Sequence, residues 1–172
     1  MSGDCQEPIN VESPDPILGL DFDGVIRKYP LPFRWWFDFY SPNDVLVRAR
    51  LTRIRGAITT FLTARIPIIL DGKLINDVNR SWHKRKVLIS GRCTKQLQQV
   101  ALSSLGSSLQ FDGIVFRTDC KEYEEKFKER VIASQRVTAF IEDRKFVRAY
   151  LRRKLGITVL APGELEAYVY RM

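Results

Sequence analysis

Five short apolar runs recur along the chain, each bounded by polar or turn-forming residues. They cover residues 17–22, 86–90, 113–117, 137–142 and 157–161. Nearly continuous runs of this length are typical of strands that are buried on both faces of a sheet. The pattern therefore predicts five buried strands.

Three of the intervals between these runs carry apolar residues at helical spacing. The pattern predicts helices within residues 94–105, 121–134 and 144–155, and Gly156 is placed to cap the last one. The residues that form the apolar faces are Leu97, Val100, Ala101, Leu105, Tyr123, Phe127, Val131, Phe146, Val147, Tyr150 and Leu151. Strands that alternate with helices of this length predict βαβ units and a parallel sheet.

The interval from about 29 to 83 breaks this alternation. It opens with an aromatic and proline-rich run at 29–42, and an arginine-rich helical pattern follows, with Asn43 or Asp44 as its N-cap. A hairpin is predicted about Asp71–Gly72. We interpret the interval as a small cap inserted over the carboxyl edge of the sheet. Its aromatic residues either stack nucleobases or fill the core of the cap.

The predicted architecture is thus a three-layer α/β fold with a central parallel sheet. Residues 1–16 form a flexible N-terminal lead, and residues 17–172 form one domain with the cap at about 29–83. A chain of 172 residues with 45% hydrophobic content is sufficient for one such domain.

Charge and cysteine content narrow the function classes. The chain carries 28 Lys and Arg against 20 Asp and Glu, a net charge of +8, which favours an anionic partner such as phosphate esters or nucleic acid. Three scattered cysteines without a CxxC pair argue against a disulfide framework and a zinc site. No signal peptide or membrane-length apolar run is found, so we expect an intracellular protein, either cytoplasmic or nuclear.

Polar residues follow the predicted strands at the edge where ligands bind in open α/β sheets. Asp21 and Asp23 follow the first strand, and Ser90, Gly91 and Arg92 follow the second. Glu142 and Asp143 follow the fourth strand, and a lysine cluster (Lys121, Lys126, Lys128) follows the third. Carboxylates suit Mg²⁺, one carboxylate can attack phosphorus, and another can transfer a proton. The set predicts metal-assisted phosphoryl transfer.

These segments, "LDFDGVI", "LISGR", a downstream lysine and "FIEDR", resemble the four ordered motifs of the haloacid dehalogenase phosphatase superfamily. The resemblance implies a Rossmann-like fold and an aspartyl-phosphate intermediate. It implies that Asp21 is the nucleophile and Asp23 the general acid and base. It also implies that Ser90, Gly91 and Arg92 bind phosphate with a lysine, and that Asp21, Asp23, Glu142 and Asp143 hold Mg²⁺.

A narrower resemblance concerns "SGR", "EDR" and the following "FVRAYLRRKLGITVLAPGEL". These segments look like the 3′-phosphatase part of phage polynucleotide kinase/phosphatase and the corresponding domain of Swiss-army-knife RNA-repair proteins. The resemblance implies a nucleic-acid or nucleotide phosphate end as substrate. Glu142 stands where many members of the superfamily have Asp, and the phosphate-binding lysine is predicted as Lys121, with Lys126 as the alternative.

Two other functions remain open from the sequence. The same chemistry could act on a small metabolite under the cap, or the domain could be a catalytically silent module that binds RNA or protein. The only histidine, His83, lies in a charged stretch and is expected at the surface. Cys93 is expected to be a small helix residue rather than a nucleophile.

Overall fold

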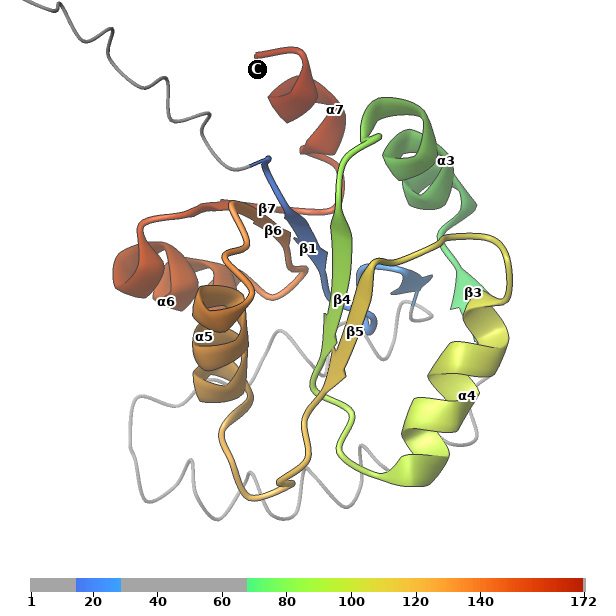
Figure 1. Cartoon of the computed structure of the whole chain (residues 1–172), viewed down its shortest axis with the longest axis vertical. Helices are drawn as coiled ribbons and strands as arrows, with labels where there is room; N and C mark the ends of the chain where they lie inside the picture. The colour runs from blue at the N-terminus through green and yellow to red at the C-terminus, as the bar shows by residue number, and fades with distance from the viewer. Residues whose placement is uncertain (1–14, 29–67, 172) are drawn as a thin grey trace, which may run out of the picture.

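The computed structural model describes residues 15–28 and 68–171. Its centre is a five-stranded parallel sheet of order β5-β4-β1-β6-β7 (Figure 1). The strands are β1 (Leu18–Leu20), β4 (Lys86–Ser90), β5 (Gly113–Phe116), β6 (Ala139–Ile141) and β7 (Thr158–Leu160). The five strands predicted from the apolar runs and their parallel arrangement are confirmed.

Helices cover both faces of the sheet, which makes three layers (Figure 1). One face packs against α3 (Gly72–Ser81), α4 (Lys95–Leu105) and α7 (Leu165–Val169), and the other against α5 (Glu124–Ser134) and α6 (Lys145–Leu155). Successive side chains of a strand point to opposite faces of the sheet, so each strand contributes to two separate cores. In β4, Leu88 faces the first helix layer, while Val87 and Ile89 face the second. Burying apolar side chains on both faces is the main force that holds the sheet in place.

The three predicted helices are confirmed, and two of them have an identifiable cap. Thr94 caps α4 by accepting a hydrogen bond from the backbone N–H of Leu97. Gly156 ends α6 in the left-handed conformation, with φ of +65°. The short helix α7 was not predicted, because five residues are too few for a helical period to stand out in the sequence.

The predicted hairpin about Asp71–Gly72 was wrong. Strand β3 (Ile69–Leu70) does belong to a small antiparallel hairpin, but its partner is β2 (Arg27–Lys28). Asp71 instead caps α3, and its side chain accepts a hydrogen bond from Leu74 N at 3.1 Å. The Asp-Gly pair resembles a turn signal, yet the buried residues Leu74, Ile75 and Val78 that follow it draw the segment into the core as a helix.

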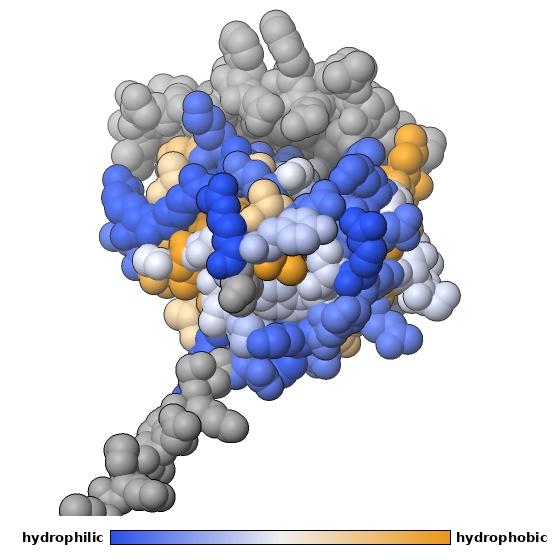
Figure 2. Space-filling model, turned by 90° about the horizontal axis from the view of Figure 1, so that it is seen from above, coloured by the Kyte–Doolittle hydropathy of each residue, from blue (hydrophilic) through white to orange (hydrophobic). Residues whose placement is uncertain are grey.

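Other parts of the predicted cap lie outside the described residues. These include the aromatic run at 29–42 and the arginine-rich helical pattern that follows it. Within residues 15–28 and 68–171, no helix is both long and apolar enough to cross a bilayer. The face at the amino ends of the strands is largely hydrophilic, with smaller hydrophobic areas between (Figure 2).

Candidate functional site

Three carboxylates meet at the carboxyl ends of β1 and β6, which are neighbouring strands. Asp21 directly follows β1, and Glu142 and Asp143 directly follow β6. One oxygen from each of the three lies within 4.8 Å of the others, a spacing that could hold a metal ion. Pairing of β1 with β6 brings Asp21 next to residues that are 121 and 122 positions later in the sequence, so the structure places Asp21 and Asp143 in one acidic group.

Lys128 lies at the centre of this group and is completely buried. Its Nζ donates a hydrogen bond to Asp21 Oδ2 at 2.7 Å and another to Glu142 Oε2, and it pairs with Glu124 Oε1 at 2.9 Å. Burial alone would lower the pKa of Lys128, but the three carboxylates outweigh burial and raise it. The lysine is therefore a permanent cation that partly neutralises the acidic group.

Asp143 is the least satisfied member of the group. Its Oδ1 is buried and has no hydrogen-bond partner. Burial, followed by the negative charge of Glu142, raises the pKa of Asp143 to about 8. Burial also raises the pKa of Asp21, and Lys128 only partly opposes this effect. An oxygen without a partner beside two further carboxylates is the environment that a divalent cation stabilises, so these residues could hold a metal ion.

Gly24 makes room for Asp143. It has φ of +81°, and a Cβ placed on it would lie 2.0 Å from Asp143 Oδ2. No side chain fits at that distance, and L residues avoid that backbone region. Gly24, which directly follows Asp23, therefore has a packing role in the acidic group as well as a role in the turn.

Glu124 and Arg144 form the border of the acidic group. Arg144 Nη2 lies 2.6 Å from Glu124 Oε1, and its Nε donates to Glu142 Oε1 at 3.3 Å. Burial opposes the ionisation of Glu124, but Arg144 and Lys128 outweigh it and lower its pKa. The pKa of Glu142 is lowered in the same way, since Lys128 and Arg144 overcome the effect of burial.

Asp23 lies beside the group and is held by two arginines. Arg92 donates from Nε to Asp23 Oδ2 and from Nη2 to Oδ1, and Arg27 Nη1 lies 3.5 Å from Oδ1. Arg92 was predicted to bind phosphate. The structure instead places its buried guanidinium against Asp23, the Leu97 carbonyl and the ring of Phe22. In this arrangement Arg92 orients Asp23.

Ser90 and Gly91 lie where the sequence predicted them, at the end of β4. Ser90 is fully buried, and its Oγ is 3.4 Å from the backbone nitrogen of Arg92. A Cβ placed on Gly91 would lie 2.5 Å from Cδ of Glu124. The Glu124 side chain thus lies directly against the loop after β4, and this contact links the end of β4 to the acidic group.

The structure places the predicted lysines elsewhere. Lys121 is exposed, and Lys126 is exposed and pairs with Glu129 at 3.3 Å. Lys128 reaches the carboxylates because it lies one helical turn after Glu124, on the buried side of α5 next to Phe127. A signal was available in the sequence, since a lysine inside the apolar face of a helix needs a buried partner.

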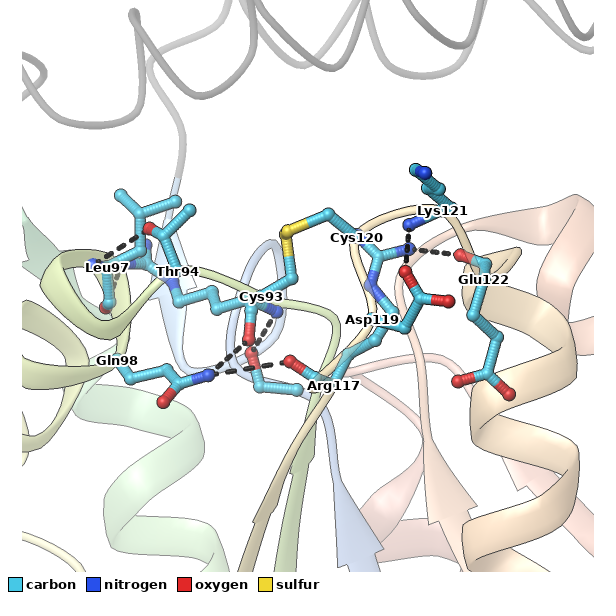
Figure 3. The surroundings of a disulfide bond; sticks show 11 residues. Cys93, Thr94, Leu97, Gln98, Arg117, Asp119, Cys120, Lys121 and Glu122 are labelled. Atoms are coloured by element: carbon cyan, nitrogen blue, oxygen red, sulfur yellow. Dashed lines mark hydrogen bonds between the residues drawn. A yellow bond between two sulfur atoms is a disulfide. The ribbon is translucent and has the colours of Figure 1, made fainter.

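Cys93 and Cys120 form a disulfide, contrary to the expectation from the sequence (Figure 3). The bond joins the loop after β4 to the loop after β5, with the two Cα atoms 5.2 Å apart. The cysteines are 27 residues apart in sequence, and only the pairing of β4 with β5 brings them together. Cys93 was also expected to be a small helix residue, but it lies in the loop after β4, before the N-cap Thr94 and the start of α4.

No family model and no curated protein matches the sequence. Among solved structures, the fold is similar to a chain of the Pnkp1/Rnl/Hen1 RNA repair complex, with a TM-score of 0.53 and 14% identity. This similarity concerns the fold. The match covers 85% of the present chain but only 42% of the other, so the present chain spans less than half of that protein's length.

Proposed function

We propose that the protein is a Mg²⁺-dependent phosphomonoesterase of the haloacid dehalogenase type that acts on nucleic-acid or nucleotide phosphate ends. The observation that carries the proposal is the gathering of Asp21, Glu142 and Asp143 oxygens within 4.8 Å around the buried Lys128. Together with Asp23 beside them, these groups match the needs of phosphoryl transfer through a carboxylate.

The first half of the reaction uses both aspartates that follow β1. An oxygen of Asp21 attacks phosphorus, a bond forms between them, and the ester P–O bond breaks. Asp23, in its protonated form, gives its proton to the departing alcohol oxygen. Arg92 and Arg27 fix the direction of the Asp23 carboxyl group.

The second half restores the enzyme. Asp23 takes a proton from water as the water oxygen attacks the phosphorus of the aspartyl-phosphate, and inorganic phosphate leaves. Lys128 is the residue we assign to the phosphoryl oxygens, together with Ser90 and Gly91 at the end of β4. Mg²⁺, held by Asp21, Asp143 and Glu142, would neutralise charge that builds up on the phosphoryl group.

A nucleic-acid end is the substrate that the charge of the chain favours. The net charge is +8, and polyanions are attracted by such an excess of cations. The narrower motif resemblance to 3′-phosphatases and the fold similarity to a chain of an RNA repair complex support the same assignment. A small sugar phosphate would use the same chemistry but would not need this charge.

The test is phosphate release with Mg²⁺ from a 3′-phosphorylated oligonucleotide, a 5′-phosphorylated oligonucleotide and a set of sugar phosphates. We expect the 3′-phosphorylated oligonucleotide to be the preferred substrate, and Asp21→Asn to abolish its turnover. Faster hydrolysis of a sugar phosphate would replace the nucleic-acid substrate with a small metabolite. No hydrolysis of any substrate would leave the domain as a silent binding module.

A further inference from the structure

Three exposed lysines stand around the carboxyl edge of the sheet. Lys95 is the first residue of α4, Lys121 lies in the loop after β5, and Lys145 is the first residue of α6. In the described part of the chain, no carboxylate lies within ion-pair distance of any of the three. Since α4, this loop and α6 follow β4, β5 and β6, the lysines surround the strand ends that carry the acidic group.

Lys95 and Lys145 do not stabilise the helices that they begin. Both α4 and α6 begin with a lysine and have no acidic residue in the first turn. A cation at a helix N-terminus opposes the helix dipole, so the position is slightly unfavourable for folding. Figure 3 shows the side chain of Lys121 pointing away from the sheet, next to Cys120. Their charge is thus available to an anion outside the protein.

Two large aromatic side chains are exposed at the same edge. Tyr123 directly precedes α5 and is 40% exposed, and Phe146 is the second residue of α6 and is 41% exposed. Glu124 directly follows Tyr123, and Arg144 lies two residues before Phe146; these two residues form the ion pair that borders the acidic group, at 2.6 Å. The two rings therefore stand at the two helix ends that this ion pair joins.

We propose that these five residues, the rim lysines (Lys95, Lys121, Lys145) and the rim aromatics (Tyr123, Phe146), bind the single-stranded nucleic acid that leads to the reacting end. The lysines contact backbone phosphates, and the rings stack on bases. Interleaved cations and rings suit a strand that carries both phosphates and bases. This inference rests on the proposed function and extends it: the substrate is a polymer, and a mononucleotide cannot reach all of the rim.

Binding without turnover tests the rim separately from the chemistry. The probe is a fluorescent 12-nucleotide single strand with a 3′-phosphate, titrated with protein in EDTA at 50 to 200 mM salt. The variants are the triple Lys95→Ser/Lys121→Ser/Lys145→Ser and the double Tyr123→Ala/Phe146→Ala. The control is Arg85→Ser/Arg153→Ser/Lys154→Ser, which removes the same charge from exposed positions before β4 and at the end of α6.

We expect the rim-lysine variant to make the slope of log affinity against log salt shallower by about 2, since each phosphate contact on a single strand contributes about 0.7. The rim-aromatic variant should lose roughly tenfold affinity or more, as loss of a stacked base does. The control variant should keep the parental slope. Equal effects of the rim-lysine and control variants, or parental affinity in the rim-aromatic variant, would overturn the inference.

Turnover distinguishes the two proposals. If the protein releases phosphate from a 3′-mononucleotide and from the 12-mer with equal KM, the proposed function stands and the rim inference fails. If the protein binds the 12-mer through the rim but hydrolyses nothing, the rim inference stands and the proposed chemistry fails. A parent protein that does not bind the strand at 50 mM salt also overturns the rim inference.

Discussion

Arg92 holds Asp23 with two parallel hydrogen bonds, from Nε to Oδ2 and from Nη2 to Oδ1, both 2.8 Å long. A third donor of the same guanidinium, Nη1, donates to the Leu97 carbonyl at 2.8 Å, and the group lies 4.7 Å from the centre of the Phe22 ring. The planar fork of arginine fits a carboxylate in this way, and a lysine cannot reproduce it. Arg92 thus links α4 to the residue that we propose moves the proton.

Arg92→Lys should slow catalysis without weakening substrate binding. A lysine keeps the charge but holds Asp23 by a single contact, so kcat should fall roughly 10- to 100-fold. This is less than the full contribution of general acid catalysis, about 100- to 10,000-fold, because Asp23 itself is still present. KM should change little. The measurement is steady-state hydrolysis of a 3′-phosphorylated oligonucleotide, with Arg80→Lys as the exposed control. A large rise in KM with an unchanged kcat would instead indicate that Arg92 binds the phosphate directly.

The stabilities of three lysine variants test whether Lys128, rather than the predicted Lys121 or Lys126, is the lysine of the acidic group. Lys128→Met removes the one cation among residues 15–28 and 68–171 that contacts both Asp21 and Glu142, and leaving buried carboxylates unpaired costs about 3–5 kcal/mol of unfolding free energy. Lys121→Met and Lys126→Met should stay within about 0.5 kcal/mol of the parent, because both residues are exposed. Urea unfolding gives all three values. Equal stability across the series would contradict the central position of Lys128.

Two glycine variants test the contact between Gly24 and Asp143. Both Gly24 and Gly156 have positive φ, so Ala at either should cost on the order of 1–2 kcal/mol of unfolding free energy. Only at Gly24 would the new Cβ overlap the Asp143 carboxylate, since nothing lies within 4 Å of a Cβ at Gly156. Gly24→Ala should therefore also lose Mg²⁺ binding, measured by calorimetry. Parental Mg²⁺ affinity in Gly24→Ala would argue against Asp143 as a ligand.

Mg²⁺ should stabilise the folded protein through the same carboxylates. At a concentration 100 times the Kd, a ligand that binds only the folded state adds about 2.7 kcal/mol, and EDTA should reverse the gain. Asp143→Asn should remove most of this stabilisation, whereas the exposed Asp119→Asn should keep it. Thermal unfolding with and without Mg²⁺ measures the difference. An equal Mg²⁺ shift in both variants would place the metal elsewhere.

The disulfide should stabilise the protein under oxidising conditions. For two cysteines 27 residues apart, the loop-entropy model gives roughly 3–4 kcal/mol. The double variant Cys93→Ser/Cys120→Ser should lose that amount in denaturant unfolding, and a dithiol reductant should have the same effect on the parent. Cys5→Ser is the control. Thiol titration of the unfolded, unreduced protein should find one free cysteine, and a count of three would show that the disulfide does not form.

The strand and helix pattern is local information, and for that reason the sequence was enough to predict it. Buried strands such as residues 86–90 are short apolar runs, and a helix such as α6 shows its apolar side every three or four residues. The turn chemistry of Asp71 was misread because an N-cap and a hairpin turn use the same residue types. Which one forms depends on whether the following residues are buried.

The amino-acid sequence by itself determined which reactive side chains follow the strands and what charge the chain carries. Asp21 and Asp23 follow one strand, Glu142 and Asp143 follow another, and basic residues are in excess. Which groups meet was decided only by the tertiary structure. Pairing of β1 with β6 brings the carboxylates together, and the packing of α5 selects Lys128 over Lys121. Side-chain contacts depend on distances between elements remote in sequence, and local propensities contain no information on those distances. The same holds for Arg92, whose partner lies 69 residues earlier.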